Sequence, residues 1–199
     1  MFLVFLVLFF NQIDGINGLA SSTFIVSILF LSFLYDGFIY ILPVIAIIFC
    51  YLLYNFRGKI GIQGDSGSYF LGSFFFIFID KELSTLNFFT SIFFLCPILF
   101  DIMATTVTRL FYMINVFEGH RNNVYQKLVS FYKSHFFSTL FFITLQIFFS
   151  LITVFLQNKF LFFEFIQKMV LISFLCFIAF IFLAYLIQNK KIFDRHKLD

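Results

Sequence analysis

The chain has 199 residues, of which 62% are hydrophobic and 12% are charged, and its mean hydropathy is +1.03. A soluble domain of this length has too little interior to bury so much apolar surface, so the composition excludes a soluble globular protein and predicts an integral membrane protein. The net charge of +3 is small, and nucleic acid is not expected as a partner. The three cysteines stand singly in apolar runs, without the paired spacing of a metal site or a disulfide: Cys50, Cys96 and Cys176.

Apolar runs alternate with polar breaks along the whole chain. Several runs are long enough to cross about 30 Å of hydrocarbon as helices that rise about 1.5 Å per residue. The sequence therefore predicts an all-α fold, a polytopic integral membrane helical bundle with about six full spans after a partial N-terminal helix. A single transmembrane domain is expected over residues 1–188, followed by a basic tail at 189–199. The apolar runs are 1–10, 18–35, 37–54, 69–79, 86–104, 136–156 and 169–187.

The first run, residues 1–10, is too short to span a bilayer as a helix. It also lacks the basic start and the small-residue cleavage site of a signal peptide. We therefore expect it to be the second half of a helix whose beginning lies outside this chain.

The distribution of Lys and Arg over the connections predicts the orientation in the membrane. One set of connections (11–17, 55–68, 105–135 and 188–199) contains ten of the thirteen basic residues, and the opposite set contains three. Because cytoplasmic loops carry an excess of Lys and Arg, the first set is expected to be cytoplasmic. Acidic and cationic groups from four separate places in the sequence then share this face, which suits a soluble, phosphorylated substrate: Asn11, Asp14, Asp65, Asp101, Arg109, His120 and Arg121.

The segment NQIDGINGLA, residues 11–20, joins the first run to the second. Its glycines permit a tight reversal, and Asn17 is a candidate helix cap. Asp14 would then lie near a helix start, where backbone N–H groups favour an anion or a cation–anion pair. An ordinary Asn/Asp/Gly turn without catalytic function explains the same residues equally well.

The segment GDSGSYFLG, residues 64–72, opens the short fourth run. Ser66 or Ser68 is expected to cap the helix, and Gly67 allows backbone to approach a ligand. Asp65 is a candidate ligand for Mg²⁺, which favours one or two carboxylates together with phosphate oxygens and water.

The segment PILFDIMATTVTRL, residues 97–110, has polar residues at helical spacing. Asp101, Thr105, Thr108 and Tyr112 form one stripe at the inner end of a span. Arg109 lies beside the stripe, where it could pair with Asp101 or bind phosphate. A structural ion pair without catalytic function is the simpler alternative.

The segment GHRNNVYQKL, residues 119–128, is expected to be a cytoplasmic loop. Arg121 offers a planar fork for phosphate oxygens, and His120 can donate or shuttle a proton. A solvated His–Arg pair without function is the common alternative.

These four segments, in this order, resemble the polyprenyl-phosphate N-acetylhexosamine-1-phosphate transferases. This family (glycosyltransferase family 4) includes the phospho-N-acetylmuramoyl-pentapeptide translocase, and the chain is most similar to the branch that initiates O-antigen-type sugar chains. The resemblance covers essentially the whole chain, but only the C-terminal portion of the family's usual sequence.

The resemblance implies a Mg²⁺-dependent phosphoglycosyl transferase. Such an enzyme transfers an N-acetylamino sugar-1-phosphate from a UDP-sugar to undecaprenyl (polyprenyl) phosphate and releases UMP, and the lipid-diphosphate-sugar that remains starts a cell-surface polysaccharide. It further implies a multi-pass protein of the bacterial inner membrane, with its catalytic loops on the cytoplasmic face. The residues that match the family's motifs are Asp65 for Mg²⁺, Asn11 and Asp14 for the nucleotide site, His120 and Arg121 for the diphosphate or sugar, and Asp101 and Arg109 for a nearby cofactor-binding helix. Asp65, Asp14, His120 and Arg121 are the expected catalytic residues.

Two features depart from the family pattern. Asn123 stands where the family's loop carries a histidine, and the chain lacks the family's adjacent pair of aspartates. The chain is therefore expected to be truncated, and two alternatives remain open. It could be a catalytically inactive remnant, or it could be half of a split transferase that needs an N-terminal partner or a homodimer. A transporter of a different class is a third alternative, but the spans contain almost no charged residues midway.

Overall fold

The computed structural model describes residues 1–34, 38–56, 63–81, 85–111, 113, 123–159, 166, 168–173, 176 and 178. Within these residues all regular secondary structure is helical, which confirms the expected all-α class. The labelled helices are α1 (Phe2–Ile13), α2 (Leu19–Leu34), α3 (Phe38–Asn55), α4 (Gly64–Lys81), α5 (Thr85–Phe111), α6 (Val124–Tyr132) and α7 (His135–Lys159).

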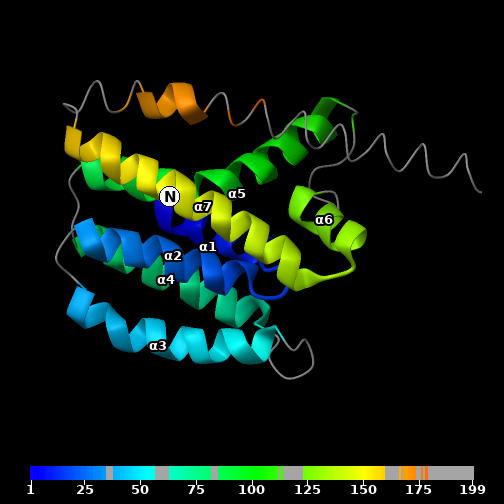
Figure 1. The fold of residues 1–199 in the computed structure, drawn as a ribbon, viewed down its shortest axis with the longest axis horizontal. Helices are drawn as coiled ribbons and strands as arrows, with labels where there is room; N and C mark the ends of the chain where they lie inside the picture. Colours follow the sequence, from blue (N-terminus) through cyan, green and yellow to red (C-terminus); the bar gives the residue numbers. More distant parts are fainter. Residues whose placement is uncertain are drawn as a thin grey trace, which may run out of the picture.

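The helices form a bundle around α2 (Figure 1). Helix α2 contacts α3 on one side and α7 on the other, and it also contacts α1, α4 and α5. Helix α1 packs mainly against α4, and α7 packs against α5 and the short α6. Helix α3 lies at one edge of the bundle, and α6 lies beside the N-terminal end of α7 (Figure 1).

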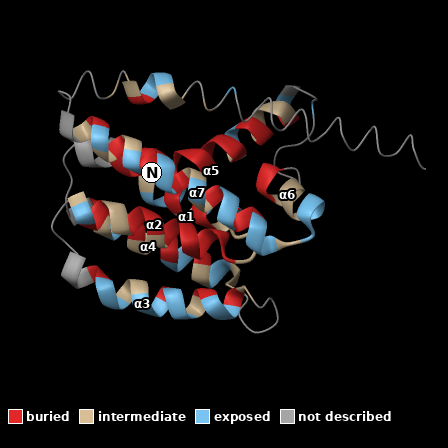
Figure 2. Cartoon of the chain, viewed as in Figure 1, coloured by how far each residue is buried: buried red, intermediate tan, exposed pale blue. Residues whose placement is uncertain are grey.

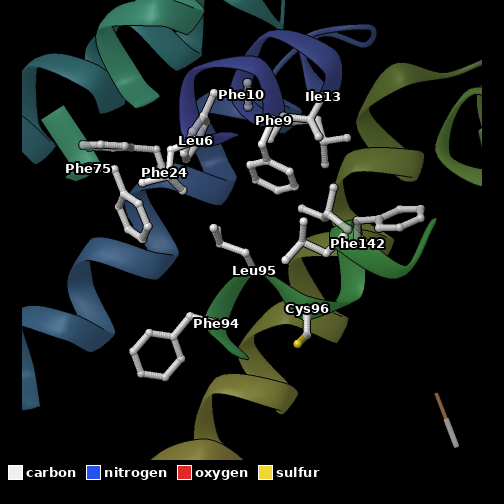
Figure 3. Close-up of a cluster of buried hydrophobic side chains, with 14 of the residues drawn as sticks. Leu6, Phe9, Phe10, Ile13, Phe24, Phe75, Phe94, Leu95, Cys96 and Phe142 are labelled. Carbon is white, nitrogen blue, oxygen red and sulfur yellow. The ribbon is translucent and has the colours of Figure 1, made fainter. Parts of the chain in front are cut away.

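Aromatic side chains fill much of the interior (Figure 3). The ring of Phe10 on α1 packs edge-on against Phe24 of α2 and Phe75 of α4, with centroid distances of 6.1 and 5.8 Å. These edge-to-face contacts are a favoured geometry for aromatic pairs, and all three rings are fully buried. These ring contacts hold α1, α2 and α4 together in the interior of the bundle.

Several helices have exposed residues on their outer faces (Figure 2), and many of the exposed residues are large and apolar. On α7 they lie along much of the helix, as on α3, where Ile47 is 70% exposed. Contiguous apolar surface of this kind is typical of a protein that meets lipid instead of water. The exposed residues of α7 include Phe136, Phe137, Leu140, Phe141, Phe148, Leu151 and Phe155.

The expectation of about six full spans is not confirmed. Among the described residues, two helical segments are long and apolar enough to cross a membrane, Thr90–Leu110 of α5 and His135–Gln157 of α7. The apolar helices Phe2–Ile13, Leu19–Leu34 and Ile41–Asn55 are shorter than the usual spanning length. The expected run at 169–187 and the basic tail at 189–199 lie mostly or wholly outside the described residues.

Helices α1 and α4 approach each other closely at Gly72. A Cβ atom at this position would lie 2.7 Å from the Cα of Val7 and 2.8 Å from the carbonyl oxygen of Leu6. Both neighbours are backbone atoms, which cannot move without displacing α1. Gly72 therefore sets the separation of the two helices, one of which carries Asn11 and the other Asp65.

A buried amide links α2 and α7 in the interior. Gln146 is fully buried, and its Nε2 donates to the carbonyl oxygen of Thr23 at 3.1 Å and to Oγ of Ser27 at 2.8 Å. Because a polar group that lacks a partner in an apolar interior is costly, these bonds specify how α2 and α7 align.

Candidate functional site

Polar side chains from several helices meet at one end of the bundle. Asn11 at the end of α1 bonds to Asp65 at the start of α4, and the backbone N–H of Gly18, just before α2, bonds to Asn55 at the end of α3. The backbone N–H of Asn17 donates to Nδ1 of His135, the first residue of α7, at 3.2 Å. The predicted convergence of distant motifs on one face therefore has a structural counterpart at the end of the bundle where these helix termini meet (Figure 1).

The contact between Asn11 and Asp65 is the centre of this polar end. Nδ2 of Asn11 donates to Oδ1 of Asp65 at 2.9 Å, and it also lies 3.2 Å from Oγ of Ser68. Asp65 is exposed, and it occupies the first turn of α4, where backbone N–H groups stabilise a carboxylate. The amide thus holds one oxygen of Asp65 in place, while the side chain remains accessible from solvent.

The expectation that Ser66 or Ser68 caps α4 is wrong. The helix begins at Gly64, before both serines, and Gly64 has a left-handed φ of 59°. Ser68 is fully buried, and its hydroxyl donates to the carbonyl oxygens of Gly64 and Asp65 at 3.1 and 3.0 Å. The left-handed backbone of Gly64 allows α4 to begin before the apolar run at residues 69–79.

Asp14 lies directly after the last residue of α1, outside the apolar helices. Burial, and to a smaller extent the negative charge of Asp65, raises the pKa of Asp14 from 3.8 to about 7. Two carboxylates at this end of the bundle repel each other, and a bound cation would relieve that repulsion. The structure thus brings Asn11, Asp14 and Asp65 into one cluster.

The turn that carries Asp14 is braced from the neighbouring helix. Gly18 has a φ of 82°, and a Cβ there would overlap the ring of Phe56 at 2.5 Å. Asn55 accepts a hydrogen bond from the Gly18 backbone and donates one to the hydroxyl of Tyr51 at 3.0 Å. Only glycine fits this reversal, because the position combines a left-handed backbone with a filled neighbouring space. The bonds described for Asn17, the predicted helix cap, are made by its backbone.

Asp101 is fully buried and bonds to α6. Its Oδ1 accepts from the backbone N–H of Val124 at 2.7 Å, and its Oδ2 accepts from that of Tyr125 at 3.0 Å. Thr105, one turn further along α5, also bonds to this carboxylate. Both oxygens of Asp101 are therefore engaged by the start of α6. Its predicted role in cofactor binding stays a prediction.

Arg109 lies near the end of α5 and is 5% exposed. A buried guanidinium retains its charge, so its surroundings must supply compensation. The alternative roles predicted for Arg109, pairing with Asp101 or binding phosphate, both remain predictions. His120, Arg121 and Tyr112 lie outside the described residues.

Helix α6 was not predicted from the sequence, because residues 105–135 were expected to form a loop. Its apolar residues Val124, Leu128 and Phe131 recur at spacings of four and three, which is the signal for an amphipathic helix. Tyr125 anchors this helix: it is fully buried, and its hydroxyl donates to the carbonyl oxygen of Gln12 at 2.8 Å. Tyr125 lies next to the candidate site, but it was not among the site residues predicted from the sequence.

The cluster fits a Mg²⁺ ion that arrives with phosphate groups. Among the described residues, no three His, Cys, Asp or Glu side chains come together, so no complete protein cage is present there. Asp65 and Asp14 supply hard carboxylate oxygens, and Mg²⁺ is commonly bound through one or two carboxylates with substrate phosphates and water. The donor set therefore suits a shared cation and not a permanently enclosed one.

Comparison with known proteins finds a match for the first part of the chain. Residues 1–82 match the model of glycosyl transferase family 4, which supports a transferase. No curated protein and no solved structure matches the chain. The matched segment contains both Asn11 and Asp65, and the family resemblance deduced from the motifs is confirmed over this segment.

Proposed function

From the match of residues 1–82 to glycosyl transferase family 4, we propose that this chain forms part of a phosphoglycosyl transferase. The reaction moves a sugar-1-phosphate from a UDP-sugar to a polyprenyl phosphate, with UMP as the leaving group. An oxygen of the polyprenyl phosphate attacks the phosphorus that carries the sugar, and the bond from that phosphorus to the bridging oxygen of UDP breaks. A lipid-diphosphate-sugar remains.

The observation that carries this proposal is the Asn11–Asp65 hydrogen bond with Asp14 beside it. It joins two motifs that lie 54 residues apart in the sequence. Phosphoryl transfer needs positioned groups and neutralised charge more than covalent chemistry from the protein. A fixed, accessible carboxylate with a second carboxylate close by meets that need.

Mg²⁺, held by Asp65 and aided by Asp14, would neutralise charge on the diphosphate when it is bound. The protein's own contribution is orientation: Asn11 directs Asp65, and the first turn of α4 stabilises its negative charge. Asp14, with a pKa of about 7, is poised to exchange its proton for a cation at neutral pH.

The remaining predicted residues have supporting roles in this proposal. Arg121 binds diphosphate oxygens, His120 contacts the diphosphate or the sugar, and Arg109 supplies a further positive charge near the end of α5. Replacing Arg121 by Ala should mainly weaken use of the UDP-sugar, and an unchanged dependence of the rate on UDP-sugar concentration would contradict that role.

The apolar exterior supports a lipid acceptor. Helices α3 and α7 have exposed faces (Figure 2) that carry large aromatic and aliphatic residues, so a polyprenyl chain could reach the polar end through the bilayer. The excess of basic residues in one set of connections along the sequence (11–17, 55–68, 105–135 and 188–199) supports a cytoplasmic site in a bacterial inner membrane.

The test is binding of UDP in the presence of MgCl₂ to the purified chain in lipid nanodiscs. Binding is measured first because it does not depend on completion of the whole reaction, and UMP release is then followed with a UDP-sugar and undecaprenyl phosphate. Asp65→Asn should abolish Mg²⁺-dependent UDP binding and any UMP release. Ser66→Asn introduces the same amide at the next exposed position and leaves the Asp65 carboxylate intact, so it should bind UDP like the parent chain. Equal binding by the parent and Asp65→Asn would reject the metal assignment, and no binding by the parent would reject the proposed function.

A further inference from the structure

Helix α6 joins the middle of the bundle to the turn that carries Asn11 and Asp14. Its first backbone N–H groups have no partners within the helix, as at any helix start. The preceding residue, Asn123, makes no side-chain cap bond. The carboxylate of Asp101, from α5, accepts these N–H bonds instead, at 2.7 and 3.0 Å. A negative charge at this position also interacts favourably with the helix dipole.

Tyr125 continues this connection toward α1. Its backbone N–H bonds to Asp101, its carbonyl oxygen accepts from Oγ of Ser138 on α7 at 2.7 Å, and its ring packs edge-on against Phe142. The residue is thus fixed by both neighbouring long helices. Since it is fully buried, its hydroxyl has one well-defined location.

That hydroxyl ends on the last turn of α1. It donates to the carbonyl oxygen of Gln12 at 2.8 Å and accepts from Nδ2 of Asn123 at 2.8 Å. The last carbonyl groups of a helix lack partners within the helix, so Tyr125 stabilises the C-terminal end of α1. Gln12 lies between Asn11 and Asp14, the two residues of this turn that face Asp65.

We infer that Asp101 and Tyr125 are positioning residues, which act through α6 to hold the Asn11–Asp14 turn against Asp65. Neither residue needs to touch a ligand for this role, because the carboxylate and the hydroxyl are both occupied by protein groups. The consequence for ligand binding rests on the proposed function, whereas the mechanical link between α5, α6 and α1 does not.

The first measurement is backbone hydrogen exchange of peptides that cover residues 11–17, in nanodiscs without ligand. Tyr125→Phe keeps the ring in place but removes the hydroxyl, so exchange in this turn should rise roughly tenfold, while exchange in α2 and α3 stays unchanged. Asp101→Asn places an N–H₂ group against the N–H donors of α6 and should raise exchange in both α6 and the turn. Ser130→Ala removes a hydroxyl of α6 that bonds only to the carbonyl oxygen of Lys127, and it should leave the turn unchanged.

The second measurement is the affinity for UDP with MgCl₂ in the same variants. Tyr125→Phe should weaken binding roughly tenfold, and this loss should largely disappear in a background that already carries Asn11→Ala. Unchanged exchange in Tyr125→Phe would overturn the link to α1. Raised exchange with unchanged affinity, or an equal loss in the Asn11→Ala background, would overturn the positioning role. If the parent chain does not bind UDP but the exchange pattern appears, the proposed function fails and the link stands.

Discussion

Nδ2 of Asn11 lies 2.9 Å from Oδ1 of Asp65, so the end of the first helix directly orients the carboxylate that opens the fourth. The partner of Asp65 in this contact is a neutral amide, so the contact itself supplies no compensating charge. Asp14, three residues after Asn11, adds a second carboxylate whose pKa is raised by burial and by Asp65. The site therefore combines one oriented and one protonatable carboxylate.

Replacing Asn11 by Asp should convert this contact into a repulsive one. Two ionised carboxylates at hydrogen-bonding distance repel each other unless a cation lies between them, so the variant should unfold at a lower temperature than Asn11→Ala when EDTA is present. Added MgCl₂ should recover more thermal stability in Asn11→Asp than in Asn11→Ala. The measurement is the unfolding midpoint in nanodiscs with EDTA and with MgCl₂. Identical responses of the two variants to Mg²⁺ would show that the ion does not bind between positions 11 and 65.

The raised pKa of Asp14 predicts a pH dependence of stability. The folded-state pKa of about 7 exceeds the ordinary value of 3.8, so between these values the native state binds more protons than the unfolded state. The destabilising contribution of Asp14 is absent below about pH 4 and complete above about pH 7, and the stability from this residue falls as the pH rises.

In Asp14→Asn, the unfolding midpoint should therefore decrease less than in the parent chain between about pH 5 and about pH 8. The midpoint is measured in Mg²⁺-free buffer across this pH range. Mg²⁺ competes with the proton, so the affinity of the parent chain for UDP with MgCl₂ should rise over the same interval. Ser130→Ala, whose hydroxyl bonds to the carbonyl oxygen of Lys127, should keep the slope of the parent chain. A parent-like slope in Asp14→Asn would assign the titration to another group.

The close approach at Gly72 predicts a large effect of a single methyl group. Gly72→Ala would force backbone atoms of Leu6 and Val7 away from α4, so it should lower the free energy of unfolding by about 1–3 kcal/mol. It should also weaken UDP binding, because α1 carries Asn11. Gly67→Ala is the comparison on the same helix: its new Cβ would lie 2.7 Å from Cγ of the Gln63 side chain, which can shift without displacing a helix backbone, so it should lose less stability than Gly72→Ala. Equal stability of the two variants in chemical unfolding would contradict the role given to Gly72.

The sequence predicted the helical class and the convergence of Asn11, Asp14 and Asp65, because turn residues between apolar runs alternate between the two ends of a bundle. It did not predict the Gly72 contact, since a glycine within an apolar run does not reveal which backbone it will face. It also missed α6, whose pattern lies within a segment read as a basic loop. Asp101 was predicted to bind a cofactor, which stays a prediction, and its bonds to Val124 and Tyr125 depend on tertiary structure that spacing along one helix cannot show.

The buried amide of Gln146 predicts how α2 and α7 hold together. Gln146→Leu removes the bonds to Thr23 and Ser27 and leaves the buried Ser27 hydroxyl without this partner, so it should lower the free energy of unfolding by about 1 kcal/mol. Adding Ser27→Ala should reverse part of this loss, because replacing both partners removes the buried, unpaired hydroxyl. Thr144→Val is the control on the same helix, where the exposed hydroxyl bonds only to the carbonyl oxygen of Leu140. If the double variant is less stable than Gln146→Leu alone, the hydroxyl of Ser27 has a stabilising partner other than Gln146, and the amide is not the link between the two helices.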